Sequence, residues 1–251
     1  MGKRVKVRLI LYVHPHDPEV FMIETRGTDS CVSFISSQFK SGGDVGTPVR
    51  RAVTISRQAG CGALAVAEKL ARYLQTHTVG DSRPWAVYDS NLIDKVLADH
   101  GLPPYLAKFL REDRVSQLED LMADVLGALP PTTTVVQHVT ETMHRLVATG
   151  NVILIGRGGN VVTAKLPHVF HVRLVAPLDT RIEHCVEAYQ MTRDKACKFC
   201  PAEDHARQRY FRKYFNANID DPLLYHMIIN TGQMTYDAAA KLIGEAVLNP
   251  D

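Results

Sequence analysis

Residues 52–70 read AVTISRQAGCGALAVAEKL and combine three signals of local structure. The first five residues form a short, largely β-branched run that is typical of a buried strand. Gly60 and Gly62 follow, and glycine is the residue that tight turns favour. The apolar residues after them fall at helical spacing: Leu64, Ala67, Leu70, Ala71 and Leu74. The stretch therefore predicts a strand, a glycine-rich turn and a helix.

The same alternation continues to the end of the chain. Strands are predicted at residues 52–56, 85–88, 151–156, 168–175 and 224–229. Helices are predicted at residues 63–74, 91–99, 114–126, 134–149, from 178 onward, and 235–247. Residues 152–155 are all apolar, as expected of a parallel strand that is buried on both faces. The pattern predicts an α/β fold, with a five-stranded parallel sheet flanked by helices.

The composition is that of an ordinary globular protein, with 45% hydrophobic and 22% charged residues in 251. This excludes a disordered chain, a collagen, a coiled coil and a disulfide-stapled miniprotein. The net charge is only +2, so a general nucleic-acid binder is not expected. No apolar run approaches the ~18–20 residues of a membrane span. Five cysteines, an odd number, fit a reducing compartment, and we expect a cytoplasmic protein without membrane partners.

The first fifty residues differ from the rest of the chain. Residues 3–8 are basic, and residues 41–44 have the composition of a flexible linker. Residues 5–13 and 20–24 could pair as a small hairpin. We divide the chain into an N-terminal extension of unknown role, residues 1–50, and a domain at residues 51–251. The extension is a true subdomain, a loosely attached segment, or the result of a start codon assigned too early.

The glycine-rich turn is the first candidate site. Ligands of open parallel sheets bind beyond the carboxyl ends of the strands, and backbone N–H groups at a helix start suit a phosphate. Residues Gly60, Cys61, Gly62 and Ala63 are the candidate phosphate-binding group. They match the phosphate-loop pattern G-x-x-x-x-G-K-[ST] poorly, since Ala63 stands where that pattern has lysine. The alternative is a glycine turn that only lets strand and helix pack closely.

Two further candidates follow predicted strands. Arg157 lies between glycines directly after residues 151–156, where its planar guanidinium could reach phosphate oxygens in a cleft. A solvent-exposed arginine is the alternative. Asp89 ends the second predicted strand, where it could accept hydrogen bonds from a substrate or cap the next helix.

Residues 193–213 carry seven Lys/Arg and three Asp/Glu, a local net charge of +4. A helix is predicted to begin at Pro201, with Glu203 and Asp204 in its first turn. Asp204 and Arg207 would share one face, and Arg209, Arg212 and Lys213 another. An arginine cluster near a glycine-rich turn suits phosphoryl transfer, whereas the alternative is a solvated face.

Metal and acyl-transfer chemistry have little support. Cys197 and Cys200 form a C-x-x-C pair, but too few ligands lie nearby in sequence for zinc, and the pair does not follow a strand. The eleven histidines show no metal-binding spacing, and no G-x-S-x-G is present. We expect no metal held by protein side chains alone.

Four segments taken together resemble the cytidylate kinase-like family, a branch of the P-loop nucleoside monophosphate kinases. They are residues 52–70, residues 152–159 (VILIGRGG), residues 170–181 (FHVRLVAPLDTR) and residues 204–231 (DHARQRYFRKYFNANIDDPLLYHMIINT). The resemblance covers about residues 52–247. It implies a P-loop kinase core, a helical acceptor-binding region near 89–149 and an arginine-rich lid near 190–215.

The resemblance also implies substrates and site residues. ATP and Mg²⁺ would be the donor pair, and the partners would be small nucleotides. The acceptor-binding D-x-x-R of the family's lid matches Asp204 to Arg207. Arg157 matches the arginine of the family's G-R-D, whose aspartate is Gly158 here, and Asp89 matches the aspartate that opens another substrate-binding segment. Arg212 is expected to act on the transferring phosphate or on the charge of the lid.

The main departure from the cytidylate kinases concerns the loop, where Ala63 and Ala65 replace lysine and threonine. Arg57, in the same turn, could supply the missing positive charge, so we expect catalysis to depend on Arg57, Arg157, Arg207 and Arg212. Alternatively, Arg57 pairs with a carboxylate and only holds the turn. Three functions stay open: a nucleotide kinase, a kinase with a non-nucleotide acceptor, and a nucleotide-binding or regulatory protein without catalysis.

Overall fold

The computed structural model describes residues 11–14, 17–23, 51–78, 83–89 and 132–249. The chain divides into two compact units, residues 1–47 and 48–251. In the first unit, strand β1 (Leu11–His14) pairs antiparallel with β2 (Asp17–Ile23). The predicted helices at 91–99 and 114–126, and with them most of the expected acceptor-binding region, lie outside the described residues.

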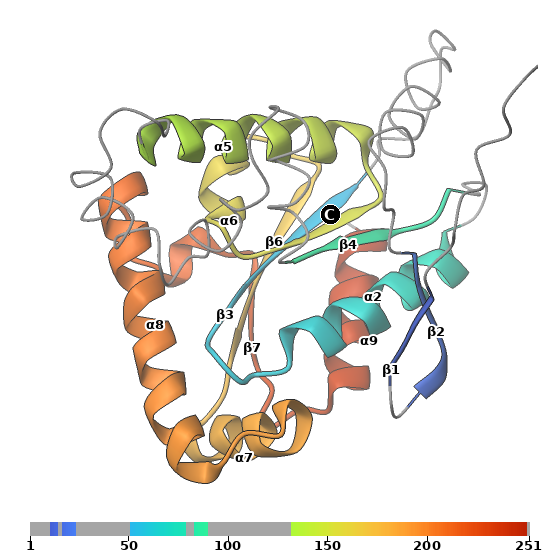
Figure 1. Ribbon diagram of the computed structural model, residues 1–251. Helices are drawn as coiled ribbons and strands as arrows, with labels where there is room; N and C mark the ends of the chain where they lie inside the picture. The colour runs from blue at the N-terminus through green and yellow to red at the C-terminus, as the bar shows by residue number, and fades with distance from the viewer. Residues whose placement is uncertain (1–10, 15–16, 24–50, 79–82, 90–131, 250–251) are drawn as a thin grey trace, which may run out of the picture. The chain divides into compact units, whose positions relative to one another are not determined.

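The second unit contains a five-stranded sheet in which all paired strands are parallel (Figure 1). Its strand order is β4-β5-β3-β6-β7. The strands are β3 (Ala52–Arg57), β4 (Ala86–Tyr88), β5 (Val152–Ile155), β6 (Val169–Val175) and β7 (Met227–Asn230). The predicted parallel sheet is confirmed, and β3 occupies its centre, so the turn after β3 leaves from the middle of the carboxyl edge.

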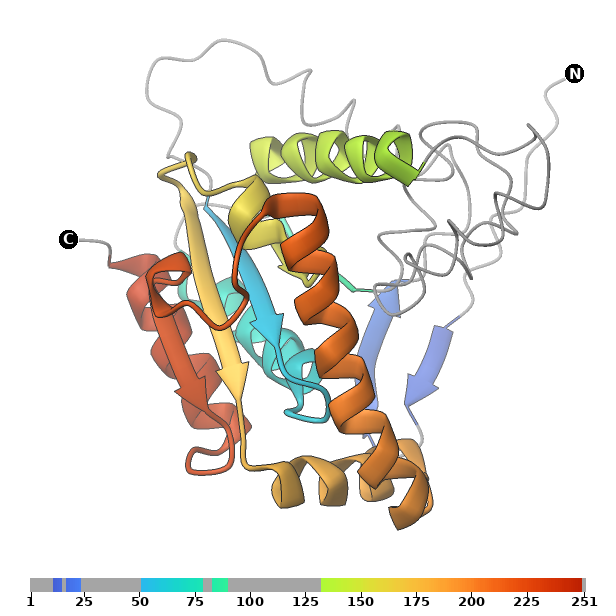
Figure 2. The same cartoon turned by 90° about the vertical axis from the view of Figure 1, so that its left-hand side faces the viewer.

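Helices cover both faces of this sheet (Figures 1 and 2). Two of them, α2 (Ala63–His77) and α9 (Tyr236–Leu248), pack against each other and against one face. The other face carries α5 (Thr132–Thr149), α6 (Gly159–Val162) and α8 (Arg193–Phe215). Helix α7 (Leu178–Tyr189) follows β6 at the carboxyl edge, and a 3₁₀ turn, η2 (Pro222–Leu224), precedes β7.

The amphipathic spacing of α2 predicts its buried face correctly except at one end. Val66, Ala67, Leu70 and Leu74 are fully buried, whereas Leu64 is 39% exposed. The reason is its angular position, because the buried face is formed by Ala63 together with residues 66, 67, 70 and 74, and Leu64 lies about 100° around the helix from Ala63. Among the described residues, no helix combines the length and apolar character needed to span a membrane.

Helix α8 corrects the predicted helix start at Pro201. The helix begins at Arg193, where the Thr192 side chain accepts a hydrogen bond from the Lys195 N–H, and Pro201 lies in the helix interior. A serine or threonine cap followed by an acidic first turn is a strong start signal, and Asp194 supplies the acid. Glu203 and Asp204 are therefore in the middle of α8, where their carboxylates are available to other elements.

Candidate active site

The loop between β3 and α2 has the backbone geometry of a tight phosphate-binding turn. Gly60 and Gly62 adopt left-handed φ angles of 79° and 74°, which glycine adopts at little cost. Gly62 is the N-cap of α2, and no side chain caps the helix there. The first N–H groups of any helix lack intrahelical acceptors, so the start of α2 offers donors and a partial positive charge to an anion.

Close packing also requires glycine at both positions. A Cβ at Gly62 would lie 2.2 Å from the Tyr236 ring, and a Cβ at Gly60 would lie 2.5 Å from the Arg181 carbonyl oxygen and 2.9 Å from Cys185 Sγ. The interpretation of this turn as a packing device therefore has direct support. It does not compete with phosphate binding, because the contacts come from α7 and α9 and leave the first turn of α2 uncapped.

Cys61 sits between the two glycines and is 2% exposed. Its thiol donates to the Gln58 carbonyl oxygen at 3.0 Å. Burial raises the pKa of Cys61 to about 11, even though Arg57, Arg207 and Arg181 act in the opposite direction. Cys61 is therefore a neutral packing residue at neutral pH, and the part it can play in binding an anion is that of its backbone.

Asp204 connects the loop to α8. Its Oδ1 accepts a hydrogen bond from the Ala59 N–H at 2.7 Å, and its Oδ2 accepts one from Arg181 Nη1 at 2.6 Å. Arg181 also donates to the carbonyl oxygens of Ala59 and Ala176. Arg207 Nη1 lies 3.5 Å from Asp204 Oδ1, and Arg207 Nη2 donates to Glu203 at 3.1 Å. The Asp204 carboxylate of α8 therefore already accepts a hydrogen bond from the loop, at the Ala59 N–H, and binds the neighbouring arginines as well.

Arg173 is a site residue that the sequence analysis missed. It lies on β6 opposite Ser56 of β3 and is 4% exposed. Its Nη1 donates to Ser56 Oγ at 2.9 Å, its Nη2 donates to Asp220 Oδ1 at 2.5 Å, and its guanidinium lies 5.7 Å from the centre of the Tyr225 ring. The available signal was a charged residue inside an apolar strand, since such residues are rarely buried without a partner.

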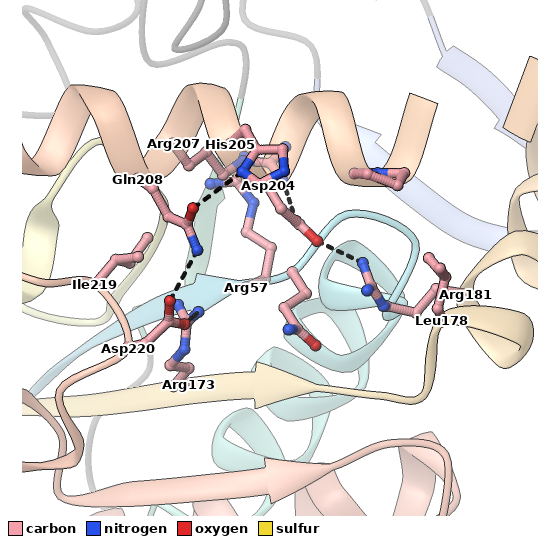
Figure 3. A pocket seen from close by; sticks show the side chains of 12 residues that line it. Arg57, Arg173, Leu178, Arg181, Asp204, His205, Arg207, Gln208, Ile219 and Asp220 are labelled. Atoms are coloured by element: carbon pink, nitrogen blue, oxygen red, sulfur yellow. Dashed lines mark hydrogen bonds and ion pairs between the residues drawn. The ribbon is translucent and has the colours of Figure 1, made fainter. Parts of the chain in front are cut away.

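A cavity of about 370 Å³ lies between α8 and strands β3 and β6 (Figure 3). We call it the α8 cavity. Four arginines line it, which we call the arginine network: Arg57, Arg173, Arg181 and Arg207. The other lining residues are Gln58, Leu178, Pro201, Asp204, His205, Gln208, Ile219 and Asp220. Four guanidinium groups against two carboxylates give the lining a net positive charge, which suits an anionic ligand.

The structure therefore brings together three of the predicted arginine and aspartate residues: Arg57, Asp204 and Arg207. It does not bring Arg157 or Arg212 to the α8 cavity. Arg157 is 7% exposed and adopts a left-handed φ of 59° directly after β5. Arg212 is on the exposed face of α8, as Arg209 is. The roles predicted for Arg157 and Arg212 stay predictions.

Arg57, the last residue of β3, and Asp89, directly after β4, meet at the carboxyl edge of the sheet, although β5 lies between these two strands. Arg57 Nη2 lies 3.7 Å from Asp89 Oδ1, and the two side chains are 17% and 36% exposed. This ion pair is the contact expected if Arg57 holds the turn. At 3.7 Å and with partial exposure the attraction is modest, so an anionic ligand in the α8 cavity can compete with Asp89 for the guanidinium.

The predicted C-x-x-C pair divides into different environments. Cys197 is exposed, whereas Cys200 is buried with its Sγ 3.6 Å from the buried Cys185 Sγ. Burial raises the pKa of Cys200 to about 12, so it is a neutral thiol at neutral pH. Among the described residues, no group of three or more His, Cys, Asp or Glu side chains could hold a metal ion.

Two solved structures resemble the fold of this chain to different extents. A crystal structure of an uncharacterized protein from Eubacterium ventriosum superposes with a TM-score of 0.58 at 16% sequence identity, covering 80% of this chain and 99% of that one. A shikimate kinase from Bacteroides thetaiotaomicron superposes less well, with a TM-score of 0.44 at 11% identity, covering 79% of this chain and 99% of that one. The first likeness shows a shared fold.

Two sequence comparisons add to this. A Corynebacterium glutamicum protein named uronate isomerase is 24% identical over 173 residues, which are 66% of this chain and 33% of that protein. The chain thus matches only about a third of the length of that relative. A family model described as the cytidylate kinase-like family matches residues 52–233, more than half of the chain.

Proposed function

The chain belongs to the cytidylate kinase-like family and has its P-loop kinase fold, and on that premise we propose that it transfers the γ-phosphoryl group of ATP to a nucleoside monophosphate or a similar small acceptor. One observation carries the proposal. The uncapped start of α2 and the arginine network face the same end of the central strand β3. Phosphoryl transfer needs positioned N–H donors and positive charge more than it needs any covalent chemistry.

In this proposal the backbone of the loop holds the nucleotide phosphates. The donors are the N–H groups at the start of α2, and bound ATP supplies the phosphoryl group to be transferred. Arg57 provides the permanent charge that Ala63 cannot provide, from a position one residue before the loop. Its guanidinium offers five donors in a planar fork, a geometry that matches phosphate oxygens.

Mg²⁺ fits the described protein residues poorly. Ala65 stands where cytidylate kinases have a threonine, so this position supplies no hydroxyl to a metal. Together with the lack of a clustered donor set in the described residues, this leaves the nucleotide phosphates as the expected ligands of Mg²⁺. We assign no protein ligand to the metal and no catalytic step to it.

A nucleotide-binding or regulatory protein without catalysis is the second candidate, and a specific observation favours it. Ala63 and Ala65 remove the two loop side chains that cytidylate kinases carry, while Asp204 already occupies the Ala59 N–H. A protein of this kind would bind ATP through the same backbone donors. It would not turn the nucleotide over with any acceptor.

The experiment that tests the proposal measures ADP release by the full chain with ATP, Mg²⁺ and a panel of acceptors. The panel contains the common nucleoside monophosphates and a set of small hydroxy acids and sugars. ADP release that depends on one acceptor supports the kinase and names the acceptor. ATP binding by calorimetry, without acceptor-dependent release across the panel, supports the second candidate instead.

A further inference from the structure

Arg173 lies at the floor of the α8 cavity (Figure 3). Its side chain is 5% exposed, and three elements fix it: β6 carries it, Ser56 of β3 accepts from it, and the Tyr225 ring lies 5.7 Å from it. An arginine stays protonated in proteins. A buried permanent charge without a negative partner is costly, so either a carboxylate of the protein or an anionic ligand stabilises the fold by neutralising it.

The carboxylate that faces this charge is far more exposed to solvent. The Asp220 side chain is 45% exposed, and it lies in the short segment that joins α8 to η2. Its two oxygens bridge separate elements, since Oδ1 accepts from Arg173 and Oδ2 accepts from Gln208 of α8 at 2.9 Å. A half-exposed carboxylate can return to water at little cost, whereas the buried guanidinium cannot.

From this asymmetry we infer that Arg173 is the binding residue for an anionic group of the acceptor, and that Asp220 is a resident carboxylate which this group displaces. The ligand class is a small molecule that carries a phosphate monoester. Arg57 and Arg207 line the same cavity and add the positive charge that a phosphate dianion requires. Displacement of Asp220 would also release its bond to Gln208, so binding is coupled to the contact between α8 and the segment after it.

The assignment rests on the proposed function, because it calls the anion an acceptor, but the binding step can be tested apart from it. The probe is inorganic phosphate, titrated into the full chain by calorimetry at low ionic strength. Asp220→Asn keeps the shape of the side chain but removes the competing charge. We expect phosphate to bind this variant about tenfold more tightly, since charge-assisted contacts are individually strong.

Arg173→Met should have the opposite effect and weaken phosphate binding about tenfold or more. Its folding is expected to survive, because the Asp220 side chain left behind is half-exposed. Arg209→Met is the matched control, since Arg209 is an exposed arginine of α8 that does not line the α8 cavity. Phosphate affinity in this control should equal that of the parent.

The outcomes separate the two proposals. If Asp220→Asn leaves phosphate affinity unchanged or lowers it, the assignment of Arg173 and Asp220 is overturned, whether or not Arg173→Met folds. If the predicted opposite signs appear while no acceptor is phosphorylated, the anion site stands and the kinase function falls. Where an acceptor is found, Arg173→Met should raise its KM more than it lowers kcat. An unchanged acceptor KM would overturn the assignment and leave the kinase function intact.

Discussion

The glycine-rich loop and the arginine network lie side by side but are built in different ways. The loop is a continuous segment whose donors are backbone N–H groups, and its shape depends on glycines that pack under Tyr236 and Arg181. The arginine network combines side chains from β3, β6, α7 and α8. Two carboxylates of the cavity, Asp204 and Asp220, already bind this network. The comparison teaches that the loop offers backbone donors from one continuous segment, whereas the arginine network is already bound by carboxylates, of which, by our inference, Asp220 gives way to a ligand.

The largest effect should come from filling the loop. Gly62→Val places a branched side chain at a φ of 74° and against the Tyr236 ring. Left-handed strain and overpacking together should cost about 2–5 kcal/mol and lower Tm by roughly 10 °C.

Thermal unfolding followed by circular dichroism checks this prediction. Gly62→Val in a Tyr236→Ala background is the control, because the truncated ring removes the clash and leaves the backbone strain. Gly62→Val should therefore lower Tm less in the Tyr236→Ala background than in the parent. If Gly62→Val has the same Tm as the parent, the close approach of α9 does not constrain the loop.

The next largest effect should come from the charge beside the loop. Arg57→Ala should lower turnover by ~10²-fold, the range expected for losing one preorganised donor to the transition state. Tm without ligand should change little, because the Arg57–Asp89 pair is partly exposed. Asp89→Asn is the control for the ion pair alone. Should both variants lose the same stability and keep their activity per molecule, Arg57 only holds the turn.

The helix-start contribution can be tested without disturbing the packing. Leu64 is in the first turn of α2 and is 39% exposed, so Leu64→Asp places a carboxylate among the predicted phosphate donors. ATP affinity should fall about tenfold through repulsion, whereas an acidic residue in a first turn should keep or raise Tm. Leu242→Asp is the matched control, since Leu242 is 40% exposed on α9. Equal ATP affinities in the two variants would contradict phosphate binding at α2.

The smallest effect concerns a second buried residue of β6. His171 is two residues before Arg173, and its Nδ1 lies 2.8 Å from Thr54 Oγ1. Burial lowers the pKa of His171 to about 4 from its ordinary value of 6.5, and the nearby His226 acts in the same direction. Unlike Arg173, it is buried neutral, so the unfolded chain binds its proton more readily than the folded chain does.

The sign of the pH dependence follows from this difference. The stability due to neutral His171 is complete above pH 6.5 and is lost as pH falls toward 4. Between pH 7 and pH 6 the free energy of unfolding should fall by about 0.7 kcal/mol through this group. Denaturant unfolding of the parent and of His171→Asn at each pH measures this free energy. In the variant it should change less between pH 7 and pH 6 than in the parent. The same pH dependence of the free energy of unfolding in both proteins would contradict the conclusion that His171 is buried in its neutral form.

Sequence patterns predicted the fold well because its signals are local. The runs 52–56 and 151–156 became β3 and β5, and the spacing of Leu70 and Leu74 identified the buried face of α2. The start of α8 was predicted wrongly because a proline is a more conspicuous sign of a helix start in the sequence than the threonine cap at Thr192 is. Such a proline is tolerated within the helix only by giving up a backbone hydrogen bond.

The candidate site was predictable only in part. Gly60, Gly62 and Arg57 could be proposed from the sequence because they lie close together in the chain at the end of a predicted strand. Arg173 was not proposed, since the contacts that give it a role join residues 56, 173 and 220, and only the tertiary fold brings them together. The contact of Asp204 with the loop is of the same kind, spanning 145 positions in the sequence.

Transfer of label from γ-labelled ATP is the most direct measurement of the central claim. The full chain is incubated with labelled ATP, Mg²⁺ and each acceptor of the panel, and the products are separated. The kinase account predicts that label appears in one acceptor, and that Arg57→Ala slows this transfer by ~10²-fold. Label that stays in ATP with every acceptor, while calorimetry shows that ATP is bound, would contradict it.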